Sequence, residues 1–160
     1  MGTFEVAIEG VISRELERHD DDRGWLTELF RHDELDKEFY PAMVYVSVTR
    51  PGVARGPHEH VDQADLFCFF GPSTFRISLW DNRSGSSTFR ARASFEAGEH
   101  RPMMVIVPKG VVHEYRNVGS CDGLVINCPN RLYAGWGRKE SVDEIRHEAD
   151  PESPFRDEAD

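Results

Sequence analysis

The chain has 160 residues, of which 39% are hydrophobic and 30% are charged, and its formal net charge is −10 at pH 7. This length predicts one domain, residues 1–160, with a sizeable hydrophobic core. The acidic charge argues against non-specific nucleic-acid binding, which needs a basic surface. No apolar run approaches the length of a membrane span, so we expect neither a nucleic-acid nor a membrane partner.

The cysteines and the N-terminal residues bear on the compartment. Cys68, Cys121 and Cys128 are odd in number and form no CxxC pair. Residues 1–5 show no basic region followed by an apolar stretch, so no secretory signal is expected. These features fit a reducing environment, and we expect a cytoplasmic protein.

Helix signals are few. His32–Phe39 is long enough for two helical turns, and Ser141–His147 starts with a serine N-cap followed by Glu144 in a capping-box pattern. Residues 138–160 carry an excess of acidic side chains. We therefore expect short helical segments near the C-terminus, and an acidic terminal segment that packs on the rest of the domain.

Strand patterns dominate the chain from residue 44 onward. Val44–Thr49 and Phe75–Trp80 alternate as half-buried strands do, and Leu66–Phe70 is a continuous apolar run typical of a strand buried on both faces. Two further buried strands are predicted over Met103–Val107 and Leu124–Cys128. Regular short strands separated by glycine- and proline-containing turns predict an all-β sandwich or barrel.

Two histidine-bearing segments lie within this strand pattern. His58 and His60 are two residues apart, so a strand would place them on one face, and His113 belongs to a later strand. Imidazoles suit divalent transition metals, and Asp65 would complete a set of three histidines and one carboxylate if the chain bends after His60. Gln63 is a further possible ligand. The alternative is that these histidines line the interior and form hydrogen bonds there.

Together the two segments resemble the two sequence motifs of the cupins, small antiparallel β-barrels with a ligand pocket inside. From about Asp21 to Pro154 the chain is similar to one cupin branch, the dTDP-4-dehydrorhamnose 3,5-epimerases and their relatives in nucleotide-sugar pathways. The resemblance implies an all-β cupin-type antiparallel barrel (jelly roll) and a homodimer, because relatives pair by exchanging or sharing strands. The motifs that carry it are Asp22-Arg23-Gly24 with Glu28 and Phe30, Arg55-Gly56-Pro57-His58, Asp81-x-Arg83-x-x-Ser86-x-Thr88-Phe89, Val107-Pro108-x-Gly110-x-x-His113 and Asp150-x-x-x-Pro154.

The resemblance also implies a reaction without a cofactor. His58 would remove a proton next to the keto group of a nucleotide-linked 4-keto-6-deoxysugar, and Asp150 would orient its imidazole. Such a proton is acidified by enolate formation, so a base with a pKa near the working pH can take it. The residues implied at the substrate are Arg55 near the sugar or phosphate, Tyr133 at the nucleotide end, Arg23 and Glu28 at the nucleotide of a neighbouring subunit, and His60, Gln63, His113 and Asn127 along the pocket.

Four positions depart from the family's pattern. Aligned through Tyr133, the family's acid tyrosine is Asn127 here, and the lysine that polarises the keto oxygen is Asp65. Leu26 replaces an aromatic residue of the opening strand, and His60 replaces a glutamine. These changes favour a single-carbon epimerase, a ketoisomerase or a metal-dependent variant over a full 3,5-epimerase.

Two other classes of protein stay open at this point. One is a metal-dependent cupin, an oxygenase or isomerase, that holds a divalent transition metal with His58, His60, Asp65 and His113. The other is a non-catalytic sugar-nucleotide binding protein, which would have kept the β-structure and lost the acid at Asn127.

Overall fold

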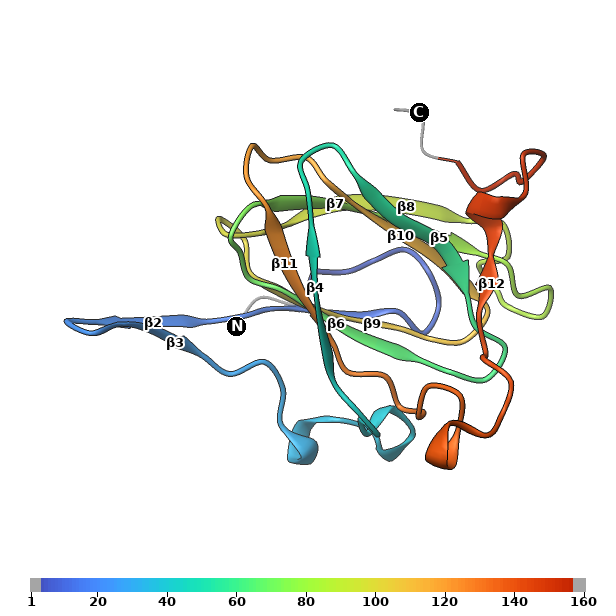
Figure 1. Ribbon diagram of the computed structural model, residues 1–160, viewed down its shortest axis with the longest axis horizontal. Helices are drawn as coiled ribbons and strands as arrows, with labels where there is room; N and C mark the ends of the chain where they lie inside the picture. The colour runs from blue at the N-terminus through green and yellow to red at the C-terminus, as the bar shows by residue number, and fades with distance from the viewer. Residues whose placement is uncertain (1–3, 157–160) are drawn as a thin grey trace.

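The computed structural model of the protein describes residues 4–156. This part of the chain is all-β, as the sequence predicts, with twelve strands and four 3-10 turns (Figure 1). The strands are β1 (Ile12–Glu15), β2 (Arg18–Asp21), β3 (Gly24–Thr27), β4 (Tyr45–Thr49), β5 (Ala54–Glu59), β6 (Asp65–Phe69), β7 (Thr74–Asp81), β8 (Arg92–Gly98), β9 (Met103–Val107), β10 (Val111–Asn117), β11 (Gly123–Asn127) and β12 (Ile145–Arg146). The 3-10 turns are η1 (His32–Glu34), η2 (Lys37–Phe39), η3 (Trp136–Arg138) and η4 (His147–Ala149).

Two five-stranded antiparallel sheets make up the body of the molecule. The first has the strand order β1-β9-β6-β11-β4, and the second has the order β12-β5-β10-β7-β8. No strand pairing among residues 4–156 joins these two large sheets, so they do not close into one ring. A third, two-stranded sheet of β2 and β3 projects away from the body (Figure 1).

Side-chain alternation builds a core between the two large sheets. Phe67 on β6 packs with Val111 and Tyr115 on β10 in one buried cluster. Because strand side chains alternate between faces, Asp65 shares the inward face of Phe67, and His113 shares that of Val111 and Tyr115. The interior is therefore apolar along most of its length and polar where Asp65 and His113 lie.

The first sheet is also buried on its outer face. Leu66 and Cys68 of β6 and Met104 of β9 pack in a second cluster under apolar side chains of segment 29–39. This arrangement confirms the prediction of a strand buried on both faces. The other four predicted strands are confirmed as β4, β7, β9 and β11.

Both predicted helices are wrong. Residues 32–39 form only the two 3-10 turns η1 and η2. In segment 141–147 the Asp143 carboxylate accepts the backbone N–H groups of Val61, Asp62 and Gln63, and β12 pairs with β5. These tertiary contacts outweigh a capping signal that is worth about 1 kcal/mol, so the C-terminal helical content is limited to the turns η3 and η4.

The C-terminal segment lies along the edge of the second sheet, beside β5 (Figure 1). Its Phe155 ring centroid is 6.2 Å from that of Trp80 on β7 and 4.6 Å from that of His147. His147 in turn donates a hydrogen bond from Nε2 to Glu59 on β5, over 2.8 Å. Within residues 4–156, no helix has the length and apolar character needed to cross a membrane.

Candidate functional site

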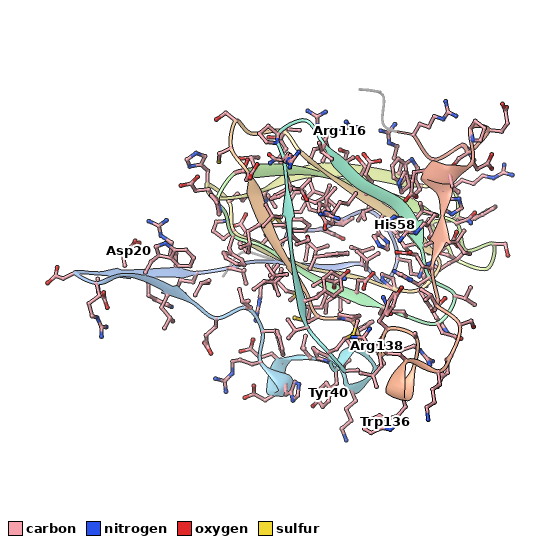
Figure 2. The ribbon with its side chains drawn as sticks, viewed as in Figure 1. Asp20, Tyr40, His58, Arg116, Trp136 and Arg138 are labelled. Atoms are coloured by element: carbon pink, nitrogen blue, oxygen red, sulfur yellow. The ribbon has the colours of Figure 1, made fainter. Side chains whose placement is uncertain are left out.

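A cavity of about 1170 Å³ lies at the polar end of the interior. Both large sheets contribute to its wall, which the loop 130–136 and the segment 138–148 complete. Figure 2 shows His58 on β5 next to β12, with Trp136 and Arg138 on the loop below. The strand residues that line the cavity are Tyr45 and Ser47 of β4, Ala54, Arg55, Gly56 and His58 of β5, Asp65 and Phe67 of β6, His113 and Tyr115 of β10, and Arg146 of β12.

His58 reaches this cavity through a bulge in β5. His113 of β10 pairs with His58, and Tyr115 of β10 pairs with Arg55. Paired positions that are three residues apart on β5 are therefore only two residues apart on β10. Directly paired residues lie on the same side of a sheet, and the bulge therefore turns both Arg55 and His58 toward the cavity. Gly56 within the bulge has φ +102°, and a Cβ there would lie 2.5 Å from the His113 carbonyl oxygen.

Two carboxylates from the C-terminal segment hold the His58 ring. Its Nε2 donates a hydrogen bond to Glu148 over 2.7 Å, and its Nδ1 lies 3.6 Å from Oε1 of Glu144. Burial nevertheless keeps the pKa of His58 below its ordinary value, because it outweighs the opposite effect of the two carboxylates. The neutral ring that results carries its lone pair on Nδ1, as a proton acceptor needs.

The structure pairs His58 with Glu148 instead of the expected Asp150. Arg146 of β12 is the register partner of His58, so residues two positions before and after Arg146 are its diagonal neighbours, and these are Glu144 and Glu148. Asp150 lies two residues further on, is exposed, and accepts a hydrogen bond from the backbone N–H of Glu152. Its carboxylate therefore stabilises a turn.

Asp65 is the centre of a buried polar cluster. Its Oδ2 lies 3.0 Å from Nε2 of His60 and 3.3 Å from Nε2 of His113, and its Oδ1 accepts hydrogen bonds over 2.9 Å from Gln63 and from Asn127. Burial acts to raise the pKa of Asp65, but the hydrogen bonds from His113 and His60 outweigh it and hold the pKa far below its usual range. Asp65 is therefore an ionised carboxylate with four donors around it.

The two histidines of this cluster meet an acceptor at each ring nitrogen. Nδ1 of His60 donates to the backbone carbonyl of Asp143, and Nδ1 of His113 donates to that of Val111 over 3.1 Å. Carbonyl and carboxylate oxygens only accept, so the His60 ring between them is best satisfied when both of its nitrogens are protonated. Burial acts to lower the pKa of His60, but Asp65 more than offsets it, and the pKa lies above its ordinary value.

The same side chains are the part of the expected metal site that the structure brings together. The ligand atoms of His60, Asp65 and His113 lie within 4.8 Å of one another. Metal-binding histidines usually donate their second ring N–H to a carbonyl or carboxylate, as both rings do here, so the set fits a divalent transition metal. His58 is outside this group, because its Nε2 is bonded to Glu148 and its ring centroid is 6.4 Å from that of His113.

Arg55 and Tyr133, two of the expected substrate contacts, line the cavity. Arg55 is held at its rim by hydrogen bonds over 2.9 Å to the Thr49 hydroxyl and to the Val48 carbonyl. Tyr133 is 51% exposed in the loop after β11. Both are therefore open to a ligand.

Arg23 and Glu28 lie away from the cavity of their own chain. Arg23 is in the turn of the β2–β3 hairpin, with 89% of its side chain exposed, and Glu28 follows β3. Figure 2 shows Asp20 on this hairpin, at the opposite end of the molecule from His58. Within one protomer these residues cannot contact a ligand at His58.

The motif that begins at Asp81 is also outside the cavity wall. Asp81 is 2% exposed and accepts hydrogen bonds from the side chains of Arg83, Ser86 and Thr88. Together these bonds hold the Asp81 pKa well below its usual range, although burial acts to raise it. This part of the resemblance therefore corresponds to a structural loop.

Sequence reasoning missed three residues of the site: Glu144, Glu148 and Tyr45. The two glutamates belong to a segment that the sequence predicted to contain a helix and to pack on the domain as an acidic terminal segment. Tyr45 begins a strand that was recognised, but only the register shows that it pairs with Asn127. No signal within one sequence gives that register.

The fold and the site define a class of protein. Two facing antiparallel sheets enclose a ligand-sized cavity, and the wall of that cavity combines a neutral imidazole with a charged imidazole–carboxylate cluster, as in small β-proteins that bind and convert a ligand in their interior. The chain belongs to the dTDP-4-dehydrorhamnose 3,5-epimerase family, whose sequence profile matches residues 5–135. The predicted family is thereby confirmed.

Known proteins agree with this assignment. The chain is 37% identical over 128 residues to the probable low-salt glycan biosynthesis epimerase Agl13 of Haloferax volcanii, covering 79% of this chain and 81% of the relative. A dTDP sugar isomerase from Desulfovibrio desulfuricans has the same fold, with a TM-score of 0.80 at 20% identity, covering 93% of this chain and 91% of that one. ChmJ, a 3'-monoepimerase from Streptomyces bikiniensis in complex with dTDP-quinovose, has a TM-score of 0.75 at 24% identity, covering 94% and 76%.

Proposed function

We propose that this protein epimerises a nucleotide-linked 4-keto-6-deoxysugar inside a cupin-type jelly roll, with His58 as the base. Family membership supports the reaction class, and the dTDP-sugar bound to ChmJ supports the kind of substrate. The cavity of about 1170 Å³ is somewhat larger than the roughly 300–1,000 Å³ typical of small-molecule sites, which leaves room for a nucleotide sugar. The observation that carries the proposal is the neutral His58 imidazole on the wall of this cavity, close to a buried cluster of N–H donors.

The chemistry follows from these two features. Removal of a proton next to the keto group by His58 leaves an enolate, and its negative charge develops on the keto oxygen. A protonated His60, held charged by Asp65, supplies the positive charge that stabilises such an oxygen. Asp65 occupies the position of the family's lysine, and it supports catalysis indirectly because it keeps the protonated His60 charged and in place.

We also propose a homodimer in which the β2–β3 hairpin reaches a partner's cavity. Arg23 is exposed in the turn of this hairpin, whose Asp20 lies at the opposite end of the molecule from His58 (Figure 2). Its guanidinium suits a nucleotide phosphate, which a partner's cavity would present to it. A cytoplasmic location remains a prediction based on the cysteine pattern.

A solvent-exchange experiment tests the function. The wild-type protein should exchange the protons next to the keto group of a dTDP-linked 4-keto-6-deoxyhexose for deuterium in D₂O, as followed by proton NMR. His58→Asn should slow this exchange by about two to four orders of magnitude, because the general base is lost. The exposed His100 provides the control, and His100→Asn should exchange like wild type. Near wild-type exchange by His58→Asn would contradict the assignment.

A metal-dependent form of the same site is the second candidate, favoured by the grouping of His60, Asp65 and His113. These residues would hold a divalent transition metal, which when bound would polarise a keto oxygen as a Lewis acid. Elemental analysis of protein purified without chelator, together with the absorption spectrum on adding Co²⁺, measures occupancy and coordination. Less than about a tenth of an equivalent of metal and no d–d bands with Co²⁺ would remove this candidate.

A further inference from the structure

Inversion at a carbon requires a proton to leave one face of the sugar and another to arrive on the opposite face. The family's tyrosine position for the second step is Asn127, and a carboxamide does not donate a proton as an acid. Asn127 is 2% exposed on β11, and its register partner across the sheet is Tyr45 on β4. A phenol group is thus present one strand away from the position where the family has one.

The hydrogen bonds around Asn127 define the role of the Tyr45 oxygen. Nδ2 of Asn127 donates to Oδ1 of Asp65 over 2.9 Å and to the hydroxyl oxygen of Tyr45 over 2.8 Å. An ionised Asp65 accepts only, so the amide must turn its NH₂ group toward it, and the Tyr45 oxygen is then the acceptor of the second bond. Among residues 4–156 no acceptor is found for the Tyr45 hydroxyl proton, which is therefore free for a ligand.

Tyr45 and His58 line the cavity from different sheets. Tyr45 is on β4, at the edge of the first sheet, and His58 is on β5 in the second sheet. A sugar ring between the two sheets would therefore have His58 toward one face and Tyr45 toward the other. Tyr45 is 46% exposed as a whole, but its phenol end lies inside the cavity wall, and this partial burial raises the pKa of Tyr45 to about 12, so the hydroxyl is protonated and able to act as a donor.

The other tyrosines of the cavity are less suited to this step. The Tyr115 hydroxyl is paired with the Ser47 hydroxyl over 2.9 Å, and its ring is packed against Phe67, Phe69 and Phe75. It also belongs to β10, in the same sheet as His58. Tyr133 lies outside the strands, in the half-exposed loop after β11.

We propose that Tyr45 is the catalytic acid that returns a proton to the face opposite His58. This assignment rests on the proposed epimerase function. In the step, the O–H bond of Tyr45 breaks and a C–H bond forms at the carbon next to the carbonyl, while the enolate electron pair re-forms the ketone. The tyrosinate then takes a proton from water, and protonated His58 returns its proton to water, so that no oxidant or other co-reactant is needed.

The test separates proton removal from proton return. A dTDP-linked 4-keto-6-deoxyhexose is incubated in D₂O, and proton NMR measures both the loss of the proton next to the ketone and the formation of the epimer. Tyr45→Phe should keep the deuterium exchange catalysed by His58 but form epimer about two to four orders of magnitude more slowly. Tyr40→Phe is the matched control, because the Tyr40 hydroxyl lies outside the cavity wall and donates to the His32 carbonyl over 3.0 Å, and it should form epimer at a rate close to wild type. Tyr115→Phe tests the other buried phenol of the cavity.

The outcomes are distinguishable. If Tyr45→Phe forms epimer like wild type, or if it loses exchange and epimerisation together, Tyr45 is not the acid. If Tyr115→Phe is the variant that keeps exchange and loses epimerisation, the role belongs to Tyr115 and the assignment is overturned. If the wild-type protein exchanges no proton next to the ketone, it is the proposed function that fails.

Discussion

At the scale of single residues, the environment of His58 sets its basicity. Burial lowers its pKa, while Glu148 at 2.7 Å and Glu144 at 3.6 Å raise it. Because the net effect lowers the pKa of His58, the ring is already neutral at a pH near 6.5, the ordinary pKa of histidine being about 6.5. The rate should therefore fall only when the pH drops below that value and His58 becomes protonated.

Glu148→Gln should move this acid limb to still lower pH. The substitution keeps an acceptor for Nε2 of His58 but removes a negative charge that favours the protonated ring. A less basic imidazole is also a weaker base, so the plateau of kcat should fall by about tenfold, short of the loss caused by removing the base. The measurement is kcat/KM and kcat between pH 5 and 8.

Asp150→Asn is the control for this experiment. Asp150 is exposed and bonded to Glu152, so the acid limb should stay in place. A shifted acid limb in Asp150→Asn, with none in Glu148→Gln, would show that the family-based partner is correct and the observed pairing is not. The sequence could not decide between them, because the choice depends on the register of Arg146 against His58.

At the scale of elements, the bulge in β5 is the feature that makes the site. It lets Arg55 and His58, three residues apart, face the same cavity. Glycine is needed at position 56 for two reasons. Its φ of +102° is unfavourable for residues with a side chain, and the backbone of β10 passes too close to leave room for one. The motif Arg55-Gly56-Pro57-His58 is therefore a structural requirement as well as a chemical one.

Gly56→Ala tests this requirement against Gly52→Ala. Both glycines have positive φ, which costs another residue about 1–2 kcal/mol. Only at Gly56 would the new Cβ meet backbone, 2.5 Å from the carbonyl oxygen of His113, whereas Gly52 has nothing within 4 Å. In urea unfolding, Gly56→Ala should lose at least about 1 kcal/mol more free energy of unfolding than Gly52→Ala. Equal losses would mean that β5 and β10 can separate freely at the bulge.

The elements also show what one sequence can predict. Strands such as Leu66–Phe70 and Met103–Val107 were predicted because hydrophobic pattern reports burial directly. Segment 141–147 was predicted as a helix because its local signal is helical, while its structure is decided by Asp143 and β12 binding residues some eighty positions away. The sequence identifies His58, His60, Asp65 and His113 as a group. It does not show which of them share hydrogen bonds.

At the scale of the whole molecule, the β2–β3 hairpin pairs with no other strand among residues 4–156, and its Trp25 ring touches the body at Phe70. It projects from the body and exposes Trp25 by 48% and Leu26 by 63% (Figure 1). The outward side of edge strand β4 is also apolar, with Val46 exposed by 60% and Val48 by 53%. Such surfaces are typical of interfaces, and a second copy would cover them while bringing Arg23 to another cavity.

Subunit complementation is the experiment that tests this arrangement. Arg23→Ala and His58→Asn should each be inactive or nearly so, because one loses a nucleotide contact and the other the base. In a mixed dimer, one site combines the intact His58 of the first chain with the intact Arg23 of the second. Random pairing gives half mixed dimers with one working site each, so co-expression should restore about a quarter of wild-type activity.

His58→Asn mixed with a double variant that carries both substitutions is the control and should restore none. If the first mixture also stays inactive although size-exclusion chromatography with light scattering shows mixed dimers, Arg23 serves its own chain or no site at all, and the proposed exchange of hairpins between cavities is wrong.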